Sequence, residues 1–292
     1  MSRLTLASAG VKARCFASLQ LVLPTRLLSR VVHSVTRVRW VPFKNVLIRA
    51  FIRGFDISLD EALITDPEAF VDFNAFFTRA LKPEARPLAP APAFLSPVDG
   101  TLSQSAHLTD GQLIQAKGHH YSATSLLTRA DWAAEFTGGT FATIYLAPYN
   151  YHRIHMPVTG TLRAWRYIPG RLFSVNSATA SALPDLFARN ERLVALFDTE
   201  RGPLAMVLVG ALFVGGIETV WSGAVTPPHR RGAPGPIVQP HTPLTLERGA
   251  EMGRFNMGST VVLLTAANAI QRPLGDSTHH TVVQGQALGT LL

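Results

Sequence analysis

The stretch Val207-Leu208-Val209-Gly210-Ala211-Leu212-Phe213-Val214 decides the fold of this 292-residue chain. A continuously apolar run of this length predicts a strand that is buried on both faces of a sheet, within a longer strand over 204–214. The segment Thr140-Phe141-Ala142-Thr143-Ile144-Tyr145-Leu146 predicts a second strand, and 285–289 a last one. From about residue 94 onward the segments are short, β-rich and broken by Gly and Pro, which indicates an α+β fold with an antiparallel, barrel-like β-rich domain.

The region before this domain has helical signals. Ser58-x-x-Glu61 has the spacing of a capping box, and Asp66-Pro67 that of an N-cap followed by proline in the first turn. Lys82-Pro83 would end the helix, because the residue before proline avoids helical geometry. We therefore predict two regions, a helical region over 1–82 and a β-rich catalytic domain over 83–292. The apolar face of the expected helix consists of Phe70, Phe73, Phe77 and Leu81.

Positive charge is concentrated at the N-terminus. Residues 1–55 contain ten Lys or Arg and no Asp or Glu, whereas the rest of the chain has 17 basic and 19 acidic side chains. A partner of this segment should therefore be anionic. Nucleic acid is the weakest option, since only this segment is basic and no base-reading motif appears.

The apolar residues of the same segment favour a lipid surface. Several recur at i, i+3 and i+4 between the cations, which predicts cationic amphipathic helices that lie in a membrane interface. No stretch of 18 apolar residues occurs, so a spanning helix is not expected. Two other interpretations stay open: a helix packed on the protein's own core, and, less favoured, a mitochondrial transit peptide. The apolar residues include Leu19, Leu23, Leu27, Val31, Trp40, Phe43, Leu47 and Phe51.

Cysteine and histidine usage gives little support for a metal centre. Cys15 is the single cysteine, which excludes an intrachain disulfide and a multi-cysteine metal site. The spacing of His152 and His155 provides two ligand-type residues but no evident third. We expect no metal.

Four short motifs occur in a characteristic order. Together they resemble those of the phosphatidylserine decarboxylases, over roughly residues 19–265. Met257 stands where we expect leucine in many bacterial members, and Glu84 where glycine is frequent; neither departure touches the expected catalytic residues. The motifs are Phe76-Phe77-Thr78-Arg79-Ala80-Leu81-Lys82-Pro83, Ser96-Pro97-Val98-Asp99-Gly100, Tyr151-His152-Arg153-Ile154-His155-Met156-Pro157 and Gly258-Ser259-Thr260.

The resemblance implies that the chain is a proenzyme. Asp99, His155 and Ser259 would form a triad in which His155 takes the Ser259 proton and Ser259 attacks the Gly258 carbonyl. The backbone would break between Gly258 and Ser259, giving a β chain (1–258) and an α chain (259–292). Gly258 suits this step because it lacks a Cβ and tolerates strained backbone.

The resemblance also implies the cofactor and the reaction. Ser259 would become a pyruvoyl group, which would form a Schiff base with phosphatidylserine and act as the electron sink for loss of CO2, giving phosphatidylethanolamine. His152 is the expected proton donor, and Tyr151 and Arg153 are weaker candidates for substrate binding. The expected partners are phosphatidylserine in anionic membranes and the two chains of one precursor as a heterodimer, itself able to dimerise. The expected location is the cytoplasmic side of the inner cell membrane, as a peripheral protein.

Three alternatives remain at this stage. The same triad with an intact Ser259 would make a membrane-associated serine hydrolase, although the nucleophile-elbow pattern Gly-x-Ser-x-Gly is missing. A pyruvoyl decarboxylase of a soluble amino acid would not need residues 16–55. A non-catalytic membrane-surface module would release no CO2.

Overall fold

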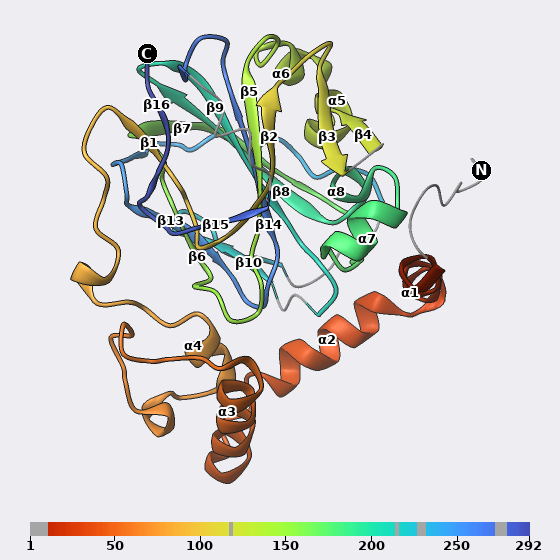
Figure 1. Ribbon diagram of the computed structural model, residues 1–292, viewed down its shortest axis with the longest axis vertical. Coiled ribbons are helices and arrows are strands. Elements are labelled where there is room, and N and C mark those ends of the chain that lie inside the picture. The colour runs from red at the N-terminus through yellow and green to blue at the C-terminus, as the bar shows by residue number, and fades with distance from the viewer. Residues whose placement is uncertain (1–10, 117–118, 214–215, 227–231, 272–278) are drawn as a thin grey trace.

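The computed structural model of the protein describes residues 11–116, 119–213, 216–226, 232–271 and 279–292 (Figure 1). Its centre is an eight-stranded sheet in which neighbouring strands are antiparallel. The order across the sheet is β12 (Thr245–Leu246), β7 (Gly160–Ile168), β8 (Arg192–Thr199), β9 (Gly202–Val209), β14 (Thr260–Thr265), β5 (Thr140–Tyr145), β2 (Gly100–His107) and β15 (His280–Val282).

The central strands are apolar on both faces. In β14, Val261 and Leu263 pack in one buried cluster, and Val262 and Leu264 pack in another. Successive side chains of a strand point to opposite faces, so a strand with a core on each side needs an unbroken apolar run. The two-sided strand predicted over 204–214 is confirmed for 204–209, which belong to β9; residues 210–213 are not part of a strand, and Val214 lies outside the described residues.

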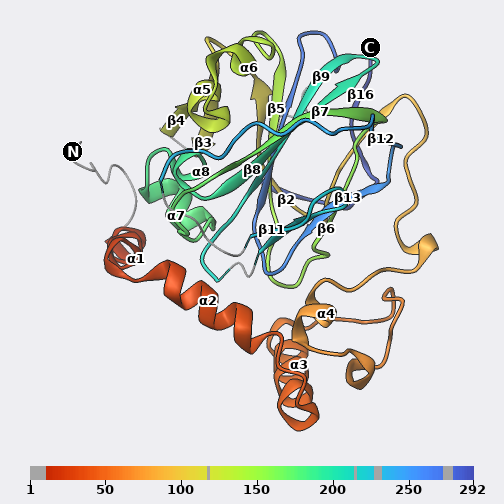
Figure 2. The ribbon, with the colours of Figure 1, turned by 180° about the vertical axis from the view of Figure 1, so that it is seen from behind.

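Three layers result (Figures 1 and 2). One face of the large sheet packs against a four-stranded sheet, through contacts that include Ile154, Ile217 and Phe255. The other face is covered by short helices that contribute Leu126 and Phe187. The smaller sheet has the order β11 (Gly223–Thr226), β10 (Ile217–Thr219), β13 (Glu251–Phe255), β6 (Arg153–His155), and the helices are α5 (Ala123–Leu127), α6 (Ala130–Ala134), α7 (Ser177–Ala182) and α8 (Leu186–Arg189).

The described strands do not form a closed barrel. The edge strands β12 and β15 pair only with β7 and β2, so the large sheet is open within the described part of the chain. The α+β class is confirmed, and the barrel-like arrangement is not. Two small ladders complete the domain: β1 (Ala93–Leu95) with β16 (Ala287–Thr290), the expected last strand, and β3 (Gln112–Ala116) with β4 (His119–Ser122).

Three helices precede this body and run along one side of it (Figure 1): α1 (Val11–Val22), α2 (Thr25–Val35) and α3 (Val41–Phe55). Each of them buries at least one polar side chain and leaves large apolar ones exposed. In α2, Ser29 is fully buried, while Leu27 is 58% exposed and Val31 52% exposed. Among the described residues no single helix is long and apolar enough to span a bilayer; Cys15–Val22 and Thr25–Val35 meet that test only when taken together, across a bend of 83°.

Between residues 58 and 82 the structure contains much less helix than the sequence predicts. Ser58 accepts a hydrogen bond from the Asp60 amide in a tight turn, and no helix follows it. Asp66 caps only a 3-10 turn, Pro67–Ala69, and the helix that follows is one short turn, α4 (Phe73–Phe77), capped by Asp72. A second 3-10 turn, Pro83–Ala85, follows Lys82. The local capping bond therefore forms as predicted for Asp66, but it starts only a three-residue 3-10 turn. Phe70, Phe73 and Phe77 of the expected apolar face are buried, although no continuous helix carries them.

Candidate active site

Ser259 lies directly before β14, in the middle of the large sheet. Its side chain is completely buried, and its Oγ has no hydrogen-bond partner among the described atoms. Its carbonyl accepts a hydrogen bond from the Leu146 amide (2.8 Å), which fixes the backbone at this point. A buried hydroxyl without a partner costs about 1–3 kcal/mol, so this position is held at the expense of stability.

One ring nitrogen of His152 lies close to Gly258, the residue before Ser259, and makes no described hydrogen bond. Its Nδ1 lies 2.8 Å from the Asn150 carbonyl oxygen, which can only accept, so Nδ1 carries the hydrogen and Nε2 carries the lone pair. Nε2 is buried, has no hydrogen-bond partner in the described part of the chain, and lies 3.3 Å from the point where a Cβ on Gly258 would stand. The Phe77 ring packs on the imidazole at 4.1 Å between centroids. His152 and the Gly258-Ser259 bond are therefore neighbours.

The protonation state of His152 follows from its burial. Desolvation lowers its pKa to about 3, against the opposing effect of the Asn150 carbonyl, and the charge of Arg79 adds to the lowering. His152 is accordingly neutral near pH 7, with Nε2 available as a proton acceptor.

The backbone before the serine is crowded and strained. A Cβ on Gly258 would also lie 3.2 Å from the Leu146 carbonyl oxygen. Met257 has a φ of 115°, a value that side-chain-bearing residues rarely adopt. Strain of this kind costs about 1–3 kcal/mol and persists only where the surroundings impose it.

His155 is engaged at both ring nitrogens. Nδ1 donates to the Gly249 carbonyl (2.8 Å), and Nε2 accepts from the Tyr151 hydroxyl (3.0 Å). Burial lowers the pKa of His155, opposed first by the Gly249 hydrogen bond. Burial likewise raises the pKa of Tyr151 to about 12, so its hydroxyl keeps the proton it donates.

Asp99 is held by an arginine that the sequence analysis did not single out. Arg86 binds both carboxylate oxygens, Nε to Oδ1 (3.1 Å) and Nη2 to Oδ2 (2.7 Å), and the Gln284 amide donates to Oδ1 (2.8 Å). Arg86 also binds Glu61 (2.8 Å). Burial lowers the pKa of Arg86, but the hydrogen bonds and charges of Asp99 and Glu61 outweigh this effect and raise it above the ordinary value.

The structure thus brings some predicted residues together and leaves others apart. No described hydrogen bond joins Asp99 to His155, or either residue to Ser259. Asp99 and His155 lie on adjoining segments, because the His155 amide donates to the Pro97 carbonyl (2.9 Å). The Asp99–His155–Ser259 triad remains a prediction, whereas His152 already lies beside Gly258.

Tyr151 and Arg153, the two weaker candidates for substrate binding, make hydrogen bonds to other parts of the protein. Arg153 donates to the Thr78 carbonyl (2.9 Å) and pairs with Glu251 (2.8 Å). Tyr151 is buried against His155. Neither lines the cavity at Gly258.

That cavity has a volume of about 280 Å³ and is mainly apolar. Residues of α3 and α4 form one wall and the segment 211–213 another. A second, more polar cavity of about 340 Å³ shares Tyr145 and Val175 with it, so the two meet at Tyr145. The first cavity is lined by Phe51, Phe55, Phe77, Tyr145, Leu146, Pro148, Ser174, Val175, Ala211, Leu212, Phe213, Met257 and Gly258.

Comparison with known proteins shows one consistent similarity. Residues 73–290 match the family model described as phosphatidylserine decarboxylase, and residues 15–56 match one described as PSD. The chain is 51% identical over 284 residues to the phosphatidylserine decarboxylase proenzyme of Azotobacter vinelandii, covering 96% of this chain and 99% of the relative. Proteins of the same description from Stutzerimonas stutzeri (50% over 282 residues, 96% and 95% of the two chains) and Alkalilimnicola ehrlichii (55% over 250 residues, 85% and 87%) are similar as well.

Proposed function

The chain belongs to the phosphatidylserine decarboxylase family, and on that premise we propose that it is a proenzyme that cleaves itself at Gly258-Ser259 and then converts phosphatidylserine to phosphatidylethanolamine and CO2. One observation carries the proposal. A buried serine hydroxyl without a partner follows a glycine that has the unengaged Nε2 of a neutral histidine beside it. A packed core retains such a costly arrangement where chemistry uses it.

The cleavage would use only atoms of the chain and water. Ser259 Oγ adds to the Gly258 carbonyl carbon, the amide C–N bond breaks as an ester C–O bond forms, and the Oγ proton passes through a base to the freed nitrogen. Loss of the Ser259 Cα hydrogen then expels Gly258 as a carboxylate. Addition of water and loss of ammonia leave a ketone at the new N-terminus, the pyruvoyl group. When formed, this group supplies the electron sink for decarboxylation.

The two histidines would have different tasks. His155 can act on Ser259 only after its Nε2 exchanges the Tyr151 hydroxyl for Oγ, with Asp99 nearby as a stabilising charge. His152 needs no such exchange, and its Nε2 can take up a proton beside residue 259 and return it to the substrate carbon. Phe77 and the surrounding core would exclude bulk water from that proton.

The apolar cavity at Gly258 fits a lipid substrate. Phe55 (41% exposed) and Phe213 (45% exposed) lie at its outer part, while Gly258 is at its inner part. A phospholipid would place its acyl chains along the phenylalanines and bring its amino-acid head group to residue 259. The more polar cavity beyond Tyr145 offers further room for the head group.

We further propose that the helices α1 to α3 lie on a membrane. Several of their apolar residues, including Leu19, Leu27 and Val46, are exposed, as are several cations, and residues 1–55 contain no acid. Trp40 is 68% exposed, and aromatic residues of this kind are favoured at the lipid interface. The combination supports peripheral attachment to an anionic leaflet, such as the cytoplasmic face of the inner membrane.

Intact mass spectrometry of the denatured protein tests the proposal. We expect two chains, 1–258 and 259–292, the second lacking its N-terminal amine and carrying a ketone that reacts with hydroxylamine. Ser259→Ala should give one full-length chain. His155→Ala should block cleavage, whereas His152→Ala in protein that has been cleaved should lose CO2 release. A single full-length wild-type mass, together with fluorophosphonate labelling of Ser259, would contradict the proposal and indicate a serine hydrolase.

A further inference from the structure

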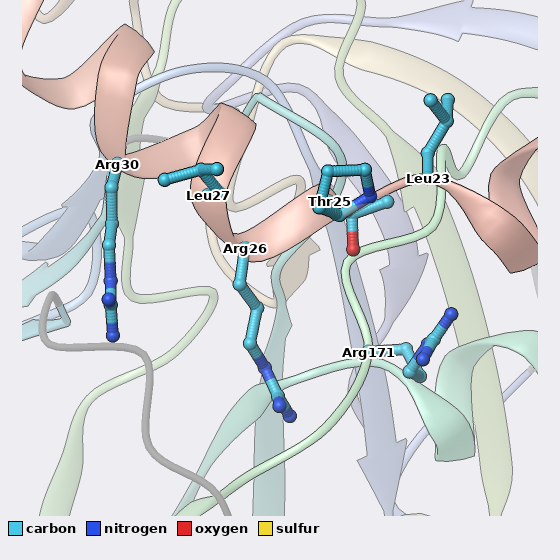
Figure 3. Close-up of a pocket in the computed structure, with 7 residues that line it drawn as sticks. Leu23, Thr25, Arg26, Leu27, Arg30 and Arg171 are labelled. Atoms are coloured by element: carbon cyan, nitrogen blue, oxygen red, sulfur yellow. The ribbon is translucent and has the colours of Figure 1, made fainter.

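A cationic pocket lies where α1 meets α2, away from the site just described. Its volume is about 270 Å³. Three arginines line it together with apolar side chains, and none of the described lining residues is acidic. The lining consists of Leu23, Pro24, Thr25, Arg26, Leu27, Arg30 and Arg171 (Figure 3).

The walls of this pocket are fixed from both sides. Arg26 of α2 donates from Nη2 to the Gly170 carbonyl (2.6 Å), and Arg171 of the body donates from Nη2 to the Leu21 carbonyl (2.9 Å). These reciprocal bonds hold the corner between α1 and α2 against the segment 170–171. The Arg171 guanidinium also lies over the Phe173 ring, 5.1 Å from its centroid, which orients its plane. The pocket is therefore a preformed feature of the fold.

Among the described residues, no carboxylate forms an ion pair with Arg30 or with Arg171. Arg30 is exposed, and Arg26 and Arg30, one helical turn apart, point to the same side of α2 in Figure 3. Arginines gathered in this way repel one another unless an anion lies between them, and their fork of N–H donors matches phosphate oxygens.

The position of the pocket indicates the source of the phosphate. Leu27 lines it and also belongs to the exposed apolar row that continues with Val31. An anion that enters here is thus beside the surface that we assign to the membrane. A lipid whose phosphate lies between the arginines can extend its acyl chains past Leu27 into the bilayer.

We propose that Arg26, Arg30 and Arg171 form a binding site for the head-group phosphate of an anionic glycerophospholipid, separate from the catalytic cavity. The site rests on the proposed membrane attachment and deepens it: it anchors the corner between α1 and α2 to one lipid, rather than to the average charge of the leaflet.

Vesicle flotation of the full-length protein tests this site. Vesicles of phosphatidylcholine alone are compared with vesicles that also contain phosphatidylglycerol, which is anionic and is not the substrate. The gain in affinity caused by phosphatidylglycerol should fall about tenfold or more in Arg30→Gln and in Arg171→Gln, the loss expected for a charge-assisted hydrogen bond. The Arg30 side chain makes no described hydrogen bond, and circular dichroism should show that Arg30→Gln folds as the wild type does.

Arg53→Gln is the matched control, because Arg53 is an exposed cation of α3 outside the pocket. It should lose at most about fivefold, the effect of one diffuse charge at a leaflet. Equal losses in the three variants would overturn the site and leave only delocalised attraction. Full recovery in Arg30→Lys would overturn it as well, since lysine restores the charge but not the forked donors.

Two further comparisons distinguish a lipid phosphate from free phosphate, and the proposed site from the proposed function. Inorganic phosphate that raises the melting temperature of the wild type but not of Arg30→Gln, with no difference on vesicles, would make the ligand free phosphate and overturn the lipid assignment. Binding to phosphatidylcholine alone, and CO2 release from phosphatidylserine in detergent micelles, test the proposed function without the pocket. If these fail while the phosphatidylglycerol gain still depends on Arg30, the site stands and the proposed function does not.

Discussion

At the scale of single residues, the burial of His152 makes the stability of the fold depend on pH. Its pKa falls from an ordinary value near 6.5 to about 3 on folding, so protons bind the unfolded chain more readily. The stability that depends on neutral His152 is fully present above about pH 6.5 and is lost as the pH falls toward 3. In uncleaved Ser259→Ala protein, the free energy of unfolding should fall by up to about 1.4 kcal/mol per pH unit in this window from this group.

Urea titrations between pH 7 and pH 4 measure this slope. Adding His152→Gln should flatten it, whereas adding His241→Gln, in an exposed loop, should leave it unchanged. An unaltered slope in the His152 variant would mean that this imidazole is not buried in the neutral form.

Gly258 shows how narrowly the cleavage point is packed. A Cβ there would approach the Leu146 carbonyl oxygen and His152 Nε2 at 3.2 and 3.3 Å, so both must move by a few tenths of an ångström. We expect Gly258→Ala to slow cleavage by about tenfold or more, since misplacement of 1 Å costs about a hundredfold. The rate is followed on denaturing gels after synthesis, with Gly54→Ala, where nothing lies within 4 Å, as the control. A wild-type rate in Gly258→Ala would show that the scissile bond is not confined in this way.

Arg86 illustrates a positioning residue that sequence reasoning missed. Its side chain and that of Asp99 are only 15% and 10% exposed, and removal of the guanidinium would leave a buried carboxylate with the Gln284 amide. Arg86→Met in the Ser259→Ala background should lower the free energy of unfolding by about 3–5 kcal/mol. The exposed pair of Arg129 and Asp131 is the control, and Arg129→Met should leave the free energy of unfolding close to that of the parent protein, because solvent screens an exposed ion pair. Equal decreases in the free energy of unfolding would show that the buried Arg86–Asp99 pair stabilises the fold no more than the exposed pair does.

At the scale of elements, α2 combines a buried polar row with an exposed apolar row. Ser29 and Thr25 face the body, while Val31 and Val35 face outward. Val31→Ser and Val35→Ser should each weaken partition onto neutral vesicles by about tenfold, the effect of burying a valine side chain, with little change in melting temperature. Val71→Ser, an exposed valine outside the helices, is the control. If it weakens partition equally, α2 is not the contact surface.

The strands were more predictable than the short helices, for a physical reason. A continuous apolar run such as 204–209 requires burial on two faces, and a strand inside a sheet meets this requirement, although the pattern did not indicate that the strand ends at Val209. Ser58 and Asp66 form the local hydrogen bonds expected of caps, but whether a helix continues depends on tertiary packing. In the candidate site, too, local sequence patterns were informative and tertiary contacts were not predictable. The motifs singled out Ser259 and His152, whose roles stay predictions, whereas the Arg86 bond to Asp99 joins segments whose contact no local pattern specifies.

At the scale of the whole molecule, the proposed cleavage would cut a chain without separating its parts. The bond lies between β13 of the small sheet and β14 of the large one. Beyond it, β14 pairs with β9 and β5, β15 with β2, and β16 with β1. Residues 259–292 thus supply a central strand, an edge strand and part of a small ladder. Val261, Val262, Leu263 and Leu264 of this segment are all buried.

We therefore expect the two chains to stay associated after cleavage and to part only on unfolding. Native mass spectrometry should show 1–258 and 259–292 as one complex under conditions where denatured protein gives two masses. The urea midpoint of the cleaved protein should rise with protein concentration, because unfolding releases two chains, while that of single-chain Ser259→Ala should not. The single chain tests whether the sheet itself is intact. A cleaved protein that loses 259–292 without denaturant would contradict the central place of β14, since the strand could then leave without breaking the core.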